Sequence, residues 1–254
     1  MTHRDFTGEF DRWAEDPARP PRTPRACCGL LTNPSFCATY VGPFYGIRAP
    51  RILFVGKDHG DADSSAPTPR DRREGILRYY RPGGSIGTRP WNPHYRGTVA
   101  LAARVLNLTC ATSCLRRCAN ADPETCTLYQ FAQANAVKCV EASKTSRRFQ
   151  GHHVIARCLP LLFDEIHMLE PHVLVLQSSE KGFVWHFRNE VEKCGRLSPV
   201  ERSEAVVKCD WNRGGASLIW FNRHPAYLPI ERYLEQWVDP HVDLVRRTIS
   251  TMTA

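Results

Sequence analysis

Short apolar runs that alternate with longer stretches of helical spacing constrain the fold of this chain most. Residues 52–55, 171–176 and 216–221 have the length and apolar content of buried strands. The stretches 98–108 and 154–169 space their apolar residues as helices do. Strands that alternate with helices favour a parallel sheet. The sequence therefore predicts an α/β fold.

Further elements follow from the same patterns. A second strand is expected within residues 128–139, ending near Cys139, and a mixed helical stretch over residues 181–208. A helix is expected over residues 230–251, and the helical stretch 154–169 is interrupted or begins near Pro160. Residues 40–45 are expected to form a loop or an edge strand.

We expect a single domain over residues 1–254, because this length suits one large α/β domain. Residues 1–25 are read as an N-terminal arm or a peripheral helix around Phe10 and Trp13. Residues 61–97 are read as a long loop that interleaves basic and aromatic side chains, as surfaces that bind nucleic-acid strands do. Residues 110–126 form a cysteine-rich insertion.

The charge balance points to a polyanionic partner. The chain has 34 Lys and Arg against 26 Asp and Glu, a net charge of +8, and this predicts a nucleic acid as the partner. No apolar run approaches the roughly 18 residues of a membrane span, and residues 1–16 lack the apolar stretch of a signal peptide. We therefore expect a cytoplasmic monomer with no membrane partner.

The chain has 11 cysteines, which in a cytoplasmic protein favour metal or cluster ligands over disulfides. One group is dense, and three of its members are four residues apart, which would place them on one face of a helix. This group is a candidate ligand set, with a buried stripe of thiols as the alternative reading. Its members are Cys110, Cys114, Cys118 and Cys126.

Polar residues with catalytic potential lie at or near the ends of three of the expected strands. Asp58 and His59 follow the run 52–55, Asn135 precedes Cys139, and His224 follows the run 216–221. Ligands of open α/β sheets bind outside the carboxyl ends of the strands. The sequence therefore predicts a site where these residues meet.

Taken in order, these segments resemble the uracil-DNA glycosylase superfamily, and most closely its iron–sulfur branch, often called family 4. The family segment ILFVGE-A-P-G is similar to ILFVG followed by Lys57-Asp58-His59-Gly60, and T-N-x-V-K-C is similar to residues 134–139. A helix that opens with a cysteine and leads into a strand resembles residues 158–176, and the motif H-P-S resembles residues 224–226. The resemblance covers roughly residues 50–230.

The resemblance implies a three-layer α/β sandwich with a central, mainly parallel four-stranded sheet. It implies that a pyrimidine is flipped out of DNA and that its N-glycosidic bond is hydrolysed, which leaves an abasic site. Asp58 would position water, His224 would stabilise negative charge on the leaving base, and Asn135 would pair with the base edge. We expect the rest of the base pocket to include Gly56, Lys57, His59 and Tyr95. The expected DNA contacts are Lys144, Arg147, Arg148 and Arg223.

Departures from the family motifs lie in the base pocket. Lys57 replaces the glutamate of the first motif and His59 replaces its proline, and the stacking phenylalanine has no clean match, so that Tyr95 or His94 would take its place. Asp58 lies where the classical G-Q-D-P-Y glycosylases have their catalytic aspartate, and Asn135 and His224 match the asparagine and the histidine of the family, so the resemblance implies that the catalytic positions are retained. The expected target is therefore uracil or a modified pyrimidine.

The resemblance also implies a [4Fe–4S] cluster, which needs four thiolates. Cys139 and Cys158 match two of the family ligands. The family's N-terminal CxxC is missing, and Cys28 and Cys37 are the favoured substitutes. The group from Cys110 to Cys126 is the alternative set, and zinc is the alternative metal.

Other functions remain open at this point. The enzyme could act in base-excision repair, or in antiviral defence by removing a bulky modified cytosine from phage DNA. A catalytically inactive DNA-binding protein with a structural cluster is an alternative of another class. A hydrolase acting on RNA or on a small molecule is a further one.

Overall fold

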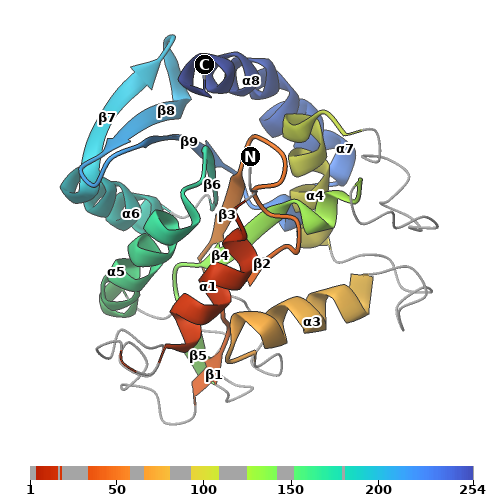
Figure 1. Cartoon of the computed structure of the whole chain (residues 1–254). Coiled ribbons are helices and arrows are strands. Elements are labelled where there is room, and N and C mark those ends of the chain that lie inside the picture. Colours follow the sequence, from red (N-terminus) through yellow and green to blue (C-terminus); the bar gives the residue numbers. More distant parts are fainter. Residues whose placement is uncertain are drawn as a thin grey trace.

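The computed structural model describes residues 4–16, 18, 34–57, 66–80, 93–108, 125–141, 152–178 and 181–253. In this part of the chain, helices flank a seven-stranded sheet (Figure 1), so the predicted α/β class is confirmed. The strands, in their order across the sheet, are β2 (Tyr40–Val41), β4 (Phe131–Asn135), β3 (Ile52–Gly56), β6 (Val173–Gln177), β9 (Ala216–Asn222), β8 (Ser203–Trp211) and β7 (Gly195–Val200).

The four central strands, β4, β3, β6 and β9, are parallel. β2 pairs antiparallel with β4 at one side, and β8 and β7 continue the sheet antiparallel to β9 at the other. The expected four-stranded sheet is therefore too small, because it corresponds only to the parallel part. β1 (Pro34–Phe36) and β5 (Cys139–Glu141) form a separate antiparallel pair. The strand expected within residues 128–139 is thus divided between β4 and β5.

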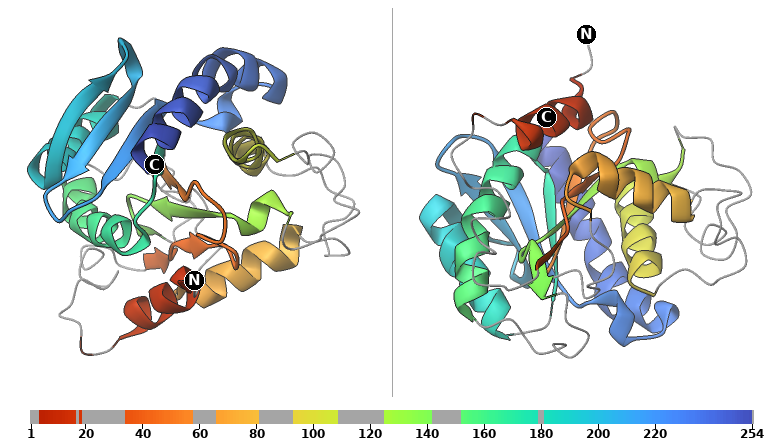
Figure 2. Two further views of the ribbon diagram at one scale, coloured as in Figure 1. Left: turned by 45° about the horizontal axis from the view of Figure 1, so that its top comes forward. Right: turned by 90° about the horizontal axis from the view of Figure 1, so that it is seen from below.

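The central strands are apolar on both faces because helices cover both. β3 and β6 are buried along their whole length. α5 (His152–Leu169) and α6 (Lys181–Cys194) pack with one face of the sheet. α4 (Pro93–Leu106) and α8 (Asp239–Thr253) pack with the other, and Figure 2 shows these layers on either side of the sheet.

Much of the expected loop over residues 61–97 is helical. α3 (Pro69–Tyr80) lies within it, and α4 begins at Pro93 rather than at the expected residue 98. Both helices begin at a proline, which is well tolerated at the first helical position because that residue needs no backbone N–H donor. Pro69 and Pro93, which lie in the stretch expected to be a loop, therefore mark helix starts.

The prediction for residues 181–208 is wrong after Cys194, where β7 and β8 follow α6. α5 begins at His152 and continues through Pro160, and the C-terminal helix is divided into α7 (Ile230–Tyr233), a π-helical turn η4 (Leu234–Val238) and α8. At the other end, α1 (Phe6–Glu15) is the peripheral helix that was one of two expectations, and it buries Phe6 and Phe10. Of the cysteine-rich insertion, residues 110–124 lie outside the described residues.

Candidate active site at the carboxyl edge of the sheet

Three of the four parallel strands end in a buried side-chain amide. These are Asn135 in β4, Gln177 in β6 and Asn222 in β9. The strand ends are in register, since Gly56 pairs with Asn135 and Gln177 pairs with Asn222. An amide carries both a donor and an acceptor, so this edge of the sheet is rich in neutral hydrogen-bonding groups.

The start of α4 covers this edge and is tied to two strand ends. Gln177 Nε2 donates to Thr98 Oγ1 over 3.0 Å, and Thr98 Oγ1 donates to the carbonyl of His94 over 2.9 Å. A Cβ atom on Gly97 would lie 2.2 Å from Cβ of Pro225, in the 3₁₀ turn η3 (Pro225–Tyr227). Glycine at position 97 therefore lets α4 pack directly against the segment that follows β9.

His94 links β4 to the segment that follows β9. Its Nε2 atom lies 2.5 Å from Nε2 of Gln133, and its ring stacks on that of His224 with centroids 4.6 Å apart and an angle of 22° between the planes. Because an amide NH₂ group only donates, Nε2 of His94 accepts this bond and the ring proton lies on Nδ1. Burial, followed by the proximity of His224 and Arg72, lowers the pKa of His94 to about 3. His94 is therefore neutral at neutral pH.

His224 is oriented by its own turn. Its Nδ1 atom accepts a hydrogen bond from the backbone N–H of Ala226 over 3.2 Å. In the neutral ring the proton then lies on Nε2, which makes Nε2–H a donor. Tyr227, which is 67% exposed, places its ring 5.2 Å from the ring of His224.

Asn135 is held against a cysteine. Its Nδ2 atom donates to Sγ of Cys37 over 3.4 Å, and only 7% of the residue is exposed. Burial raises the pKa of the Cys37 thiol. The NH₂ group of Asn135 is thus already engaged, whereas its Oδ1 atom has no hydrogen-bond partner among the residues that the structure describes.

A buried ion pair fixes the segment after β4. Lys138 donates from Nζ to Thr39 Oγ1 over 3.0 Å and also contacts the carboxylate of Glu165. The side chains of Lys138 and Glu165 are only 1% and 8% exposed. The carbonyl of Lys138 accepts the backbone N–H of Cys37 over 2.9 Å. The pair therefore anchors the backbone that carries Cys37 next to Asn135.

Backbone hydrogen bonds join the exits of β3 and β4. The carbonyls of Gly56 and Lys57 accept the backbone N–H groups of Ala136 and Val137, each over 2.8 Å. Asp58 and His59, which follow directly, lie outside the described residues. The structure therefore places the start of their segment beside Asn135 but not their side chains.

The structure places the other expected pocket and DNA residues less centrally. Tyr95 is 8% exposed in the core of the α4 face, and its hydroxyl accepts a hydrogen bond from Arg72 over 3.1 Å. His94, not Tyr95, stacks on His224. Arg223 is half-buried, with its guanidinium carbon 5.7 Å from the ring centroid of Trp237. Lys144, Arg147 and Arg148 lie outside the described residues.

The expected cluster ligands are only partly placed. Cys37 directly follows Phe36, whose Cα partner in the β1–β5 pair is Cys139, so this pair brings the two cysteine backbones close together. Cys158 is buried in the apolar core on the α5 face. Cys28 lies outside the described residues, and within the described part of the chain no three or more His, Cys, Asp or Glu side chains converge. The ligand set stays a prediction.

Sequence reasoning missed four residues of this edge. They are Gln133, Gln177, Thr98 and Tyr227. Gln133 carried a usable signal, since a residue two positions before Asn135 in a strand lies on the same face. Gln177 also carried a signal, because it directly follows the apolar run that ends at residue 176. Thr98 and Tyr227 gave no such signal, because their positions depend on how α4 and η3 pack.

Comparisons with known proteins add no family. No model of a known protein family matches the chain, and no curated protein matches it. Among the described helices, none is both long and apolar enough to cross a membrane.

Proposed function

We propose that this protein is a DNA glycosylase that flips a pyrimidine out of DNA and hydrolyses its N-glycosidic bond. The observation that carries the proposal is that Asn135 lies at the same edge of the sheet as the segment that carries His224, beside the strand exit that leads into Asp58. The net charge of +8 supports a polyanionic substrate. The exposed ring of Tyr227 next to His224 suits stacking on a base.

In the proposed reaction the bond between C1′ of the sugar and the base nitrogen breaks, and its electron pair leaves with the base. The Nε2–H group of His224 donates to a base oxygen and stabilises the negative charge that develops there. Asp58 orients the water whose hydroxyl adds to C1′, and the remaining proton of that water is transferred to the base. The products are a free base and an abasic site. Asn135 offers its Oδ1 atom to a donor on the base edge.

The expected [4Fe–4S] cluster would be held by Cys28, Cys37, Cys139 and Cys158. The pairing of β1 with β5 supports this set, because it brings the backbones of Cys37 and Cys139 close together. A bound cluster would stabilise the fold around Asn135. A zinc ion on cysteine ligands is the alternative.

Base choice is the second part of the proposal. Lys57 and His59 differ from the family pattern, and a lysine adds donors suited to extra oxygen atoms on a substituted base. Uracil is one candidate target, and a bulky modified cytosine of phage DNA, removed in antiviral defence, is the other.

The variants Asp58→Asn and His224→Ala test the proposed catalysis. Each is expected to lower base release about 100-fold or more while DNA binding is retained, because a preorganised electrostatic partner is lost. Abasic sites are counted in oligonucleotides with uracil or modified cytosine at one position. His186→Ala on α6 is the matched control. Near-normal release by both variants rejects these roles, and DNA binding without any release by the wild-type protein favours an inactive DNA-binding protein.

A further inference from the structure

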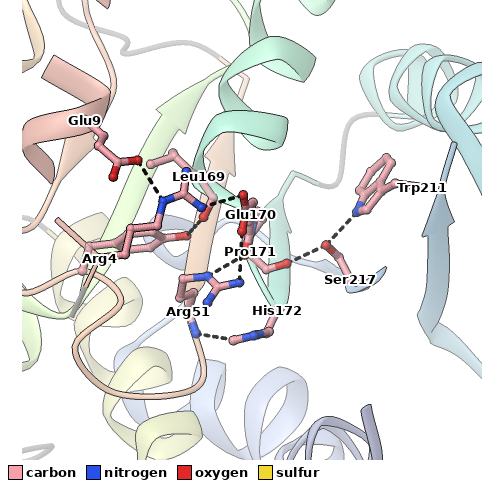
Figure 3. Close-up of polar contacts among 10 residues, drawn as sticks. Arg4, Glu9, Arg51, Leu169, Glu170, Pro171, His172, Trp211 and Ser217 are labelled. Carbon is pink, nitrogen blue, oxygen red and sulfur yellow. Dashed lines mark hydrogen bonds and ion pairs between the residues drawn. The ribbon is translucent and has the colours of Figure 1, made fainter. Parts of the chain in front are cut away.

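The opposite edge of the sheet holds a cavity that the proposed reaction does not use. β3, β6 and β9 begin there, directly after Arg51, His172 and Gly215. The cavity has a volume of about 720 Å³, within the range of roughly 300–1,000 Å³ that is usual for small-molecule sites. All the residues that line it are described, and Figure 3 shows the polar network along its wall.

Hydrogen bonds fix the polar wall of this cavity. The backbone N–H of Arg51 donates to Nδ1 of His172 over 2.9 Å, and Arg51 Nε donates to the carbonyl of Glu170 over 2.7 Å. Trp211 Nε1 donates to Ser217 Oγ over 2.9 Å, and Ser217 Oγ donates to the carbonyl of Pro171 over 2.6 Å (Figure 3). These side chains are therefore preorganised.

The polar groups that remain for a ligand are mainly donors. Because Nδ1 of His172 accepts the Arg51 N–H, the ring proton lies on Nε2. The two terminal nitrogens of Arg51 make no hydrogen bond among the described residues, and the nearest, Nη2, lies 3.9 Å from a carboxylate oxygen of Glu170. The guanidinium of Arg213, with its side chain 66% exposed, approaches Asp164 only to 3.8 Å.

Two acceptors on the wall are already engaged. Oε1 of Glu170 accepts from Arg4 over 2.7 Å, and Ser217 Oγ accepts from Trp211 Nε1 over 2.9 Å. Apolar surface completes the cavity through Trp211, Ile166, Pro171 and Met252. The cavity thus combines donors from Arg51, His172 and Arg213 with apolar surface that includes part of Trp211.

We propose that this cavity binds a small organic anion, namely a carboxylate or phosphate carried on a flat ring. The anionic oxygens accept from Arg51, Arg213 and His172 Nε2–H, and the ring packs on Trp211. This site lies at the far end of the strands from His224. Its occupation is therefore independent of whether the protein releases bases.

Calorimetric titration of the full-length protein tests this proposal with two matched pairs of probes. Benzoate is compared with benzamide, and uridine 5′-monophosphate with uridine, and inorganic phosphate serves as an anion without a ring. At least one of the two ring anions is expected to bind with Kd below about 1 mM, and about tenfold more tightly than its uncharged partner and than inorganic phosphate. Tight binding of benzoate would indicate a carboxylate ligand, and tight binding of uridine 5′-monophosphate would indicate a phosphate ligand. Binding by neither ring anion overturns the proposal, as does equal binding of the charged and uncharged partners or of inorganic phosphate.

Variants locate the binding. His172→Asn keeps an acceptor for the Arg51 N–H but removes the Nε2–H donor, and Arg213→Ala removes an exposed guanidinium. Each is expected to weaken binding of the tighter ring anion about tenfold. Arg247→Ala is the control, since the Arg247 side chain is 63% exposed and its partner is Glu201. Should His172→Asn fail to fold, Arg213→Ala suffices. An equal loss in Arg247→Ala, or no loss in Arg213→Ala, places the anion elsewhere and rejects the site.

Discussion

The two edges of the central sheet are built from different chemistry. At the carboxyl edge, buried side-chain amides lie at or near the strand ends. They form hydrogen bonds with neutral partners, as Gln133 does with His94 and Gln177 does with Thr98. At the amino edge, charged side chains dominate, and Arg4 bridges Glu9 and Glu170 in a half-exposed network. The two edges therefore differ in the kind of polar group that is buried. Neutral groups can be buried once bonded, whereas ion pairs at this sheet edge keep contact with solvent.

One element breaks this division. Lys138 and Glu165 form an ion pair that is almost fully buried, and it lies on the segment that carries the candidate site. A buried pair of this kind is costly to bury and costly to break. We infer that this ion pair positions the backbone of Cys37 and Asn135. Substitution of its residues therefore tests how the two edges differ.

Removal of the expected cluster has the largest predicted effect. Cys139→Ser and Cys158→Ser are each expected to abolish the broad visible absorbance of anaerobically purified protein and to lower its solubility, because cluster binding is coupled to folding. Cys194→Ser changes the last residue of α6, directly before β7. It is the control, and this variant should remain coloured. If the wild-type protein is colourless and contains stoichiometric zinc, the site binds zinc and not a cluster. If the wild-type protein is folded and free of metal, both metal sites are rejected.

Lys138→Met should have the next largest effect, a loss of stability. The substitution leaves the Glu165 carboxylate buried without its partner, which is expected to lower the free energy of unfolding by about 3–5 kcal/mol. Urea denaturation measures this change. The double variant Lys138→Met/Glu165→Leu removes both charges and should recover a large part of the loss. A single variant as stable as the wild-type protein would show that the pair is not needed for folding.

The half-buried, neutral His94 predicts a loss of stability in acid. Its pKa is about 3 in the folded protein, against about 6.5 when unfolded, so between these values the unfolded chain binds more protons. Stability is therefore complete above about pH 6.5 and falls as the pH decreases towards 3, by up to about 1.4 kcal/mol per pH unit from this residue. His94→Gln should flatten this decline between pH 6.5 and 4. An unchanged slope would contradict a neutral His94 ring in the folded protein.

The exposed network at the amino edge should matter least. The side chains of Arg4 and Glu170 are 39% and 50% exposed, and pairs of this kind contribute about 0–1 kcal/mol. Arg4→Ala is therefore expected to change the free energy of unfolding by no more than about 1 kcal/mol, with a smaller change still in high salt. A loss as large as that of Lys138→Met would remove the distinction between the two edges.

The sequence predicted the central strands well because both of their faces are buried. Residues 52–55 and 173–176 are continuous apolar runs bounded by proline, glycine or polar residues, which few other structures allow. β8 escaped prediction because one face is open to solvent, and polar residues such as Lys208 and Asp210 interrupt its apolar pattern. The helices that begin at Pro69 and Pro93 escaped prediction because proline is common both in loops and at the first position of helices.

The candidate site was predictable only as far as it depends on strand ends. Asn135 and His224 could be placed at one edge because parallel strands end together. The stacking of His94 on His224 could not, because it requires the tertiary placement of α4, which Gly97 permits by its close approach to Pro225. The bond from Asn135 to Cys37 likewise joins residues 98 positions apart.

The most direct test of the account is a product analysis with the wild-type protein. Oligonucleotides that carry uracil or modified cytosine at one position, together with phage DNA containing hypermodified cytosine, are incubated with the protein and examined by mass spectrometry. The account predicts that at least one of these DNAs yields a free pyrimidine and an abasic site in equal amounts. DNA that remains intact in every case, or that is cut without release of a base, would contradict it.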